Sequence, residues 1–186
     1  MPDPKRVAIL ISGRGSNMQA LVEQAQGYEV VLVASNKCSA VGLDWAQSRG
    51  LPTWASDSKG IDKEYWDQML SRTLQDHHVG TVALAGFMRV LSPWFIGQWR
   101  GRIVNIHPSL LPKYRGLDTH QRAIDAGDRV GGCSVHVVTE ELDAGEVLGS
   151  TVVPIEPGDT ATALEQRVLA AEHQLYPRIL SEFVQR

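Results

Sequence analysis

The stretch RVAILISGRGSN, residues 6–17, indicates the fold class of the chain. Residues 6–12 form a continuous apolar run ending in a small residue, which is typical of a strand buried on both faces of a parallel sheet. Gly13 and Gly15 then end the strand. Ser16 suits the N-cap of a helix that we expect to reach about Gln26. The sequence therefore predicts a strand, a tight glycine turn and a helix at the start of the chain.

The same pattern repeats through the next part of the chain. Short apolar and β-branched runs predict further strands at 28–35, 51–55, 81–85 and 103–106. Apolar residues at helical spacing predict helices at 40–49, 61–78 and 119–126. Because strands and helices alternate, we expect an α/β fold whose mostly parallel sheet carries helices on both faces.

The pattern changes in the last part of the chain. Two β runs, at 133–138 and 147–153, are separated by residues 139–146, which are too few for a crossover helix. We therefore expect an antiparallel hairpin with a long loop. Thr160 begins a long final helix to about Val184, in which Pro177 should introduce a kink. The prediction is a single-domain, Rossmann-like, open twisted sheet over residues 1–186, mostly parallel, with this hairpin and a long C-terminal helix.

Composition limits the classes of function. The 186 residues carry a formal net charge of −3, with 43% hydrophobic and 21% charged residues, as is ordinary for a globular domain. This charge disfavours nucleic acid as a partner, and no apolar run approaches the roughly 18 residues that span a bilayer. Cys38 and Cys133 form no disulfide framework, and the polar start of the chain lacks a signal-peptide pattern. We expect a cytoplasmic protein without nucleic-acid or membrane partners.

The glycine turn at residues 12–17 has the features of an anion site. Glycines let the backbone approach a ligand, and the start of the following helix offers free N–H groups. A dinucleotide is disfavoured, because Asn17 stands where a third small residue is usual and residues 34–36 supply no carboxylate. No lysine is present for a Walker A loop. A monophosphate is the better interpretation, and a tight turn without a ligand is the alternative.

Asn105 and His107 alternate along one predicted strand, so their side chains should point to the same face. Ligands bind at the carboxyl ends of strands in open α/β sheets. An amide N–H and a protonated imidazole suit a developing oxyanion, which predicts acyl transfer. The alternative for His107 is a packing or capping histidine.

Asp143 is one of three acidic residues in the four residues 140–143, within the predicted hairpin loop. A carboxylate beside His107 would orient the imidazole and stabilise its protonated form. Sequence spacing alone leaves open whether the two meet, and a solvated loop acid is the alternative. The remaining histidines have no metal-ligand spacing, so we expect no metal site; they are His77, His78, His120, His136 and His173.

Several stretches together resemble the phosphoribosylglycinamide formyltransferases, a branch of the folate-dependent formyltransferases. The resemblance covers nearly the whole chain. NIHPSLLP followed by VTEELDAG is specific to folate-dependent formyltransferases, and SGRGSN is specific to this branch. The matching stretches are residues 9–21, 35–37, 84–93, 101–116, 134–145 and 171–177.

The resemblance implies a reaction of purine (IMP) biosynthesis. The amine of N1-(5-phospho-D-ribosyl)glycinamide would take the formyl group of the cosubstrate 10-formyltetrahydrofolate, giving the N-formyl product and tetrahydrofolate. Asn105, His107 and Asp143 fall on the three catalytic positions of the family. Asn105 and protonated His107 would hold the tetrahedral oxyanion, while Asp143 would support His107 and organise a water for proton transfer. An amine is already a nucleophile, so no metal is implied.

The resemblance also implies two binding sites. The nucleotide would lie on Gly15, Ser16, Asn17 and Pro108, with Glu172 on the ribose hydroxyls. Without the resemblance, Glu172 would be taken for a surface acid. The folate would lie against Asn105 and a run of four residues, with Lys63 near its glutamate tail; the run is Met88, Arg89, Val90 and Leu91.

Two residues depart from the pattern of the branch. Lys63 stands where some relatives have arginine, which keeps the charge without the planar fork. Arg115 precedes Gly116 at a position where proline is common in this branch. Arginine there is more typical of sister formyltransferases that act on other amines. The alternatives are therefore such a sister enzyme, a nucleotide-dependent dehydrogenase, or a non-catalytic nucleotide-binding protein. We expect residues 1–100 to bind phosphate and 101–186 to carry catalysis and folate binding, in a monomer or homodimer.

Overall fold

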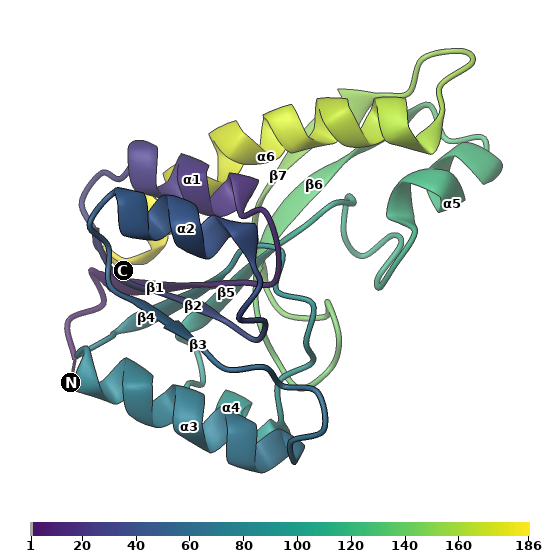
Figure 1. Cartoon of the computed structure of the whole chain (residues 1–186). Helices are drawn as coiled ribbons and strands as arrows, with labels where there is room; N and C mark the ends of the chain where they lie inside the picture. Colours follow the sequence, from purple (N-terminus) through teal and green to yellow (C-terminus); the bar gives the residue numbers. More distant parts are fainter. Residues whose placement is uncertain (1) are drawn as a thin grey trace.

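The computed structural model describes residues 2–186, which form one seven-stranded sheet in the order β3-β2-β1-β4-β5-β6-β7 (Figure 1). The first five strands in this order run parallel, and β6 and β7 are antiparallel to their neighbours. The strands are β1 (Arg6–Ile11), β2 (Glu29–Ser35), β3 (Thr53–Ala55), β4 (Thr81–Leu84), β5 (Ile103–His107), β6 (Val130–Val137) and β7 (Val147–Pro154). The predicted α/β class, the mostly parallel sheet and the antiparallel hairpin are confirmed.

Helices cover both faces of the sheet, with α1, α2 and α6 on one face and α3 and α4 on the other (Figure 1). The helix α5 lies beside β6 at the end of the molecule where α6 begins (Figure 1). The helices are α1 (Ser16–Glu23), α2 (Val41–Ser48), α3 (Lys63–Asp76), α4 (Pro93–Gln98), α5 (Thr119–Asp125) and α6 (Ala161–Phe183). Among the described residues, no helix is both long and apolar enough to cross a membrane.

The first strand explains why the sheet has a core on each side. Val7, Ile9 and Ile11 pack into the core that α1, α2 and α6 cover, whereas Ala8 and Leu10 pack into the other. All five side chains are fully buried. A strand buried on both faces needs a continuous apolar run, which is what residues 6–12 provide.

One local prediction is wrong, and one short helix was missed. Ser16 is the first residue of α1 and not its N-cap, because Gly15 precedes the helix in the left-handed conformation (φ 74°) and no side chain caps it. The short helix α4 was not predicted, although its start has ordinary signals. Ser92 accepts a hydrogen bond from the Phe95 amide, and Pro93 occupies the first turn.

The last helix continues through Pro177. A proline inside a helix leaves the carbonyl four residues earlier without its N–H donor. That carbonyl belongs to His173, and the Gln24 side chain donates to it at 3.0 Å. The buried Tyr176 hydroxyl lies 3.0 Å from the Leu84 carbonyl oxygen and 3.1 Å from that of Val104, so its single hydrogen is shared between them. Tyr176 thus holds α6 against β4 and β5, which carry the site.

Candidate active site

The order of the strands places a crevice at the carboxyl ends of β1 and β4. From β1 the chain proceeds outward to β2 and β3, then returns to β4 on the other side of β1. Connections on opposite sides leave a cleft at such a switch point, where ligands of open α/β sheets bind. The glycine turn follows β1, and the turn at Gly86 follows β4. Both turns line a cleft of about 360 Å³.

The glycine turn forms one end of this cleft. Gly15 has φ +74°, and a Cβ atom there would lie 2.8 Å from the Met18 methyl carbon, so the turn needs glycine. With no side-chain cap, the first amides of α1 have free N–H groups. Ser16 and Asn17 line the cleft with Gly15, and Lys37 adds a positive charge. The turn can bind an anion.

Asn17 and Glu172 meet in the wall of the cleft. The Asn17 amide Nδ2 donates to Glu172 Oε2 at 2.7 Å, although the residues lie near opposite ends of the chain. Glu172 is only 6% exposed, so it is not the surface acid that its helix position alone would suggest. The pKa of Glu172 is raised to about 7, because burial and the nearby charge of Glu165 raise it by more than the hydrogen bond from Asn17 lowers it. The cleft thus holds a buried acid near the glycine turn.

The structure brings Asn105, His107 and Asp143 together. His107 Nδ1 lies 3.4 Å from Asp143 Oδ2, and both side chains are more than nine-tenths buried. Asn105 and His107 lie on β5, whereas Asp143 comes from the loop after β6 with a left-handed backbone (φ 49°). The Gly116 amide donates to Asp143 Oδ2 at 2.9 Å. The contact that sequence spacing left open is therefore present.

The hydrogen bonds of His107 bear on its protonation. Nε2 lies 2.9 Å from the Tyr114 carbonyl oxygen, which only accepts, so Nε2 carries a hydrogen. Nδ1 then faces a carboxylate. A neutral ring would turn a lone pair toward that negative charge, whereas an imidazolium donates to both partners. The geometry suits a protonated His107.

Asp143 has two further neighbours that favour its ionised form. Burial alone would raise the pKa of Asp143. The hydrogen bonds from His136 and the Gly116 amide, with the charges of His107 and His136, outweigh burial and lower the pKa below its ordinary value. Asp143 is therefore a carboxylate at neutral pH.

His136 was missed in the sequence analysis, where it was considered only as a metal ligand. Its Nε2 lies 3.2 Å from Asn105 Nδ2 and 3.5 Å from Asp143 Oδ1. Its Nδ1 lies 3.0 Å from the carbonyl oxygen of Val137. His136 faces Asn105 because β6 pairs antiparallel with β5 in that register. Finding it from the sequence would need the register of these two strands.

The predicted folate-binding residues lie in two neighbouring segments. The Arg89 guanidinium donates to the Lys63 carbonyl at 3.1 Å and lies 3.7 Å from Asp67 Oδ1, so the loop after β4 contacts the start of α3. Met88 and Val90 are exposed apolar side chains, 72% and 65%, whereas Leu91 is buried in the core. Only the backbone of Leu91 is thus suited to face a ligand.

Pro108 and its neighbours connect the cleft to the cluster of Asn105, His107 and Asp143. Pro108 and Ile106, the two residues flanking His107, both line the cleft. The Pro108 carbonyl accepts from the Thr119 hydroxyl at 2.7 Å. No group of three or more His, Cys, Asp and Glu side chains within residues 2–186 is arranged to hold a metal ion.

Fold and site together define a class: an open α/β protein with a glycine turn that can bind an anion, and a cluster of an amide, an imidazole and a carboxylate around the end of β5. The model of the family described as formyl transferase matches residues 5–180. The chain belongs to this family.

Relatives and solved structures agree with this assignment. Phosphoribosylglycinamide formyltransferase of Escherichia coli (strain K12) is 42% identical over 95% of this chain and 86% of its own length. The trifunctional purine biosynthetic protein adenosine-3 of Drosophila melanogaster is 48% identical over 97% of this chain, which spans only 14% of that protein. The crystal structure of phosphoribosylglycinamide formyltransferase from Brucella melitensis has a TM-score of 0.91 at 46% identity, covering 97% of this chain and 96% of that one.

Proposed function

We propose that this chain transfers the formyl group of 10-formyltetrahydrofolate to the amine of N1-(5-phospho-D-ribosyl)glycinamide. The products are the N-formyl nucleotide and tetrahydrofolate, in a step of de novo purine (IMP) biosynthesis. The family supports formyl transfer, and the names of the relatives support this acceptor. The observation that carries the proposal is the His107–Asp143 contact beside the cleft.

The reaction uses three side chains in this proposal. The amine nitrogen donates its lone pair to the formyl carbon, and the carbonyl π electrons move to the oxygen. Asn105 Nδ2 donates to the resulting oxyanion, and the positive charge of protonated His107, whose two N–H groups face Asp143 and the Tyr114 carbonyl, stabilises it. A water organised by Asp143 carries the proton of the attacking amine to the folate N10, and the bond from the formyl carbon to N10 breaks.

The nucleotide occupies the cleft in this proposal. Its phosphate lies on Gly15, Ser16 and Asn17, and Glu172 accepts from the ribose hydroxyls. Pro108 lies between this site and His107. The buried position of Glu172 and the free amides of α1 support the assignment.

The folate lies on the other side of the reacting atoms in this proposal. Its pterin contacts Asn105 and the loop after β4, and its glutamate tail reaches Lys63. The exposed side chains of Met88 and Val90, and the contact of Arg89 with the Lys63 carbonyl, support a binding surface there. The loop residues are Met88, Arg89, Val90 and Leu91.

We place the enzyme in the cytoplasm, acting on small-molecule substrates as a monomer or homodimer. The two free cysteines, Cys38 and Cys133, are compatible with a reducing compartment. Residues 1–100 supply the phosphate turn, and residues 101–186 supply the catalytic side chains. Acid groups from the second half, Glu165 and Glu172, share the nucleotide cleft with that turn.

A formyl-transfer assay tests the proposal. The protein is mixed with the glycinamide ribonucleotide and a 10-formyl folate, and the change in folate absorbance is followed. Parallel reactions with other amine acceptors test the sister-enzyme alternative. Turnover with the glycinamide ribonucleotide alone is expected. A folded protein that turns over none of the acceptors, or only a different one, would refute the proposed function.

A further inference from the structure

Residues Lys113–Leu117, which we name the strap, contact the catalytic pair through backbone atoms. The Tyr114 carbonyl accepts from His107 Nε2 at 2.9 Å. The Gly116 amide donates to Asp143 Oδ2 at 2.9 Å. Both contacts depend on where the strap backbone lies and not on its side chains. Whatever fixes the strap therefore fixes His107 and Asp143 relative to each other.

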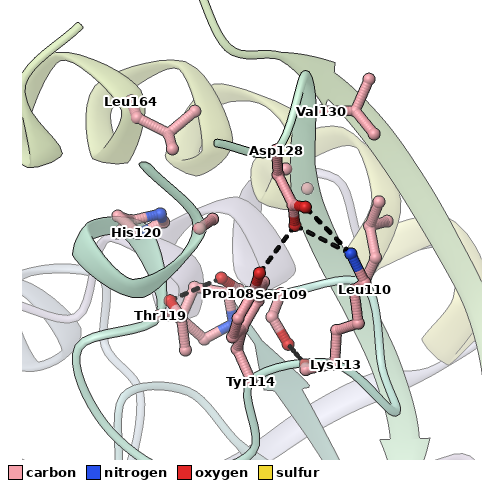
Figure 2. A pocket seen from close by; sticks show the side chains of 13 residues that line it. Pro108, Ser109, Leu110, Lys113, Tyr114, Thr119, His120, Asp128, Val130 and Leu164 are labelled. Carbon is pink, nitrogen blue, oxygen red and sulfur yellow. Dashed lines mark hydrogen bonds and ion pairs between the residues drawn. The ribbon is translucent and has the colours of Figure 1, made fainter. Parts of the chain in front are cut away.

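Asp128 holds the first half of the strap. The Tyr114 hydroxyl donates to Asp128 Oδ2 at 2.8 Å, and Lys113 Nζ lies 2.9 and 3.1 Å from its two oxygens, as Figure 2 shows. Tyr114 needs such a restraint because its backbone is in the left-handed region (φ 54°), which a non-glycine residue adopts only when its surroundings enforce it. Asp128 thus anchors the Tyr114 ring through its hydroxyl group. Because the ring is held, the backbone of Tyr114 and its carbonyl are restrained as well.

Arg122 of α5 holds the second half. Its Nη1 donates to the Arg115 carbonyl at 2.7 Å and to the Leu117 carbonyl at 3.1 Å. Its guanidinium carbon also lies 5.2 Å from the centre of the Tyr114 ring. These carbonyls flank Gly116, so Arg122 fixes the peptide that donates to Asp143.

The ion pair of Arg115 with Glu141 is a weaker restraint. It joins the strap to the loop that carries Asp143 at 2.7 Å, but its side chains are 41% and 74% exposed. Exposed pairs contribute little, because water screens them and two long side chains lose freedom. The same holds for the ion pair of Lys113, which is 61% exposed, so the main restraints are the Tyr114–Asp128 hydrogen bond and the two contacts of Arg122 with backbone carbonyls.

Packing beneath the strap is incomplete. A cavity of about 220 Å³ lies between the strap, α5 and β6, lined by Tyr114, Ala123, Gly132 and Leu164 among others (Figure 2). Close-packed neighbours would fix a segment by shape alone. Here the polar contacts of Asp128 and Arg122 must do so.

We propose that Asp128 and Arg122 are positioning residues for formyl transfer, which act through the backbone of the strap on His107 and Asp143. The inference rests on the proposed function. It predicts that loosening the strap lowers turnover without weakening the binding of either substrate, because neither Asp128 nor Arg122 belongs to the proposed nucleotide or folate site.

Steady-state kinetics of Tyr114→Phe, Asp128→Ala and Arg122→Gln test this proposal. We expect kcat to fall about 10-fold in each, the effect of one hydrogen bond lost near the transition state, with KM for both substrates within about twofold of wild type. Tyr114→Phe added to Asp128→Ala should cause no further loss, because both remove the same contact.

The split between kcat and KM separates positioning from general loosening. If the Tyr114 carbonyl moves away, His107 loses the acceptor that orients its ring, so kcat falls while KM for both substrates is kept. A general loosening of the fold would weaken substrate binding as well.

Tyr28→Phe is the matched control, since it also removes a hydroxyl hydrogen bond, to the Leu21 carbonyl, away from the site. It should leave kcat and KM unchanged. Wild-type kcat in Tyr114→Phe and Arg122→Gln, or a rise in KM equal to the fall in kcat, would overturn the inference. If Asp128→Ala does not fold, these two variants decide alone. Absence of wild-type turnover would instead refute the proposed function.

Discussion

His107 Nδ1 and Asp143 Oδ2 lie 3.4 Å apart in a buried contact, although one residue ends β5 and the other lies in the loop after β6. β6 pairs antiparallel with β5, with Val137 opposite Val104, so the loop after β6 leaves beside the start of β5 and folds back to bring Asp143 to His107. Hydrogen bonds from the strap hold both side chains. The catalytic proposal depends on this pair.

The first prediction concerns His107. His107→Ala removes the positive charge proposed to stabilise the oxyanion, so we expect kcat to fall by about 10²–10⁴-fold, with little change in nucleotide binding. Stopped assays of formyl transfer and calorimetric titration with the glycinamide ribonucleotide measure the two quantities. His78→Asn, at an exposed residue remote from the site, is the control. A variant of His107 with near wild-type kcat would assign the histidine a packing role.

A second prediction concerns stability and Glu172. Its pKa is about 7 in the folded protein, above the ordinary value of 4.5, so the folded state binds this proton more tightly than the unfolded state. As pH rises from about 4.5 to about 7, ionisation of the buried acid therefore lowers the free energy of unfolding. Relative to wild type, Glu172→Gln should become more stable over this window, by roughly 3 kcal/mol at most.

Urea unfolding of both proteins at pH 5 and pH 8 measures this difference. Glutamine keeps an oxygen for the Asn17 amide, so the variant removes the charge and retains the hydrogen bond. Glu29→Gln, at an exposed position, should show no such trend. If the stability difference between Glu172→Gln and wild type were the same at both pH values, the pKa of Glu172 would not be raised.

A third prediction concerns His136. His136→Ala removes the partner that Asn105 and Asp143 share, so both should lose orientation and kcat should fall about 10-fold. KM for the nucleotide should stay the same, since His136 does not line the cleft. His77→Asn, at the C-terminal end of α3, is the control. Unchanged kcat in His136→Ala would show that Asn105 and Asp143 are held by other contacts.

The fold was largely predictable because its signals are local. A run such as residues 6–12 shows burial on both faces, and the short spacing between 138 and 147 excludes a crossover helix. The errors are local as well. Ser16 has the chemistry of an N-cap, but Gly15 takes that position because the turn needs a positive φ. The signal of Ser92 and Pro93 for α4 was present and overlooked.

The site was predictable only in part because its contacts are not local. Alternation along β5 placed Asn105 and His107 on one face. Asp143 was selected among neighbouring acids only by resemblance, since no period in the sequence relates it to His107. His136 depends on the register between β5 and β6, and the Tyr114 carbonyl depends on backbone geometry. Such partners become visible only when distant segments are placed in space.

The most direct test of the catalytic proposal is a comparison of kcat and nucleotide dissociation constant between Asp143→Asn and wild type. Asparagine retains an acceptor for the Gly116 amide and loses the charge that faces His107. The account predicts that kcat falls on the order of 10²–10³-fold while the dissociation constant changes less than about twofold. Equal losses in turnover and binding, or an unchanged kcat, would contradict the account.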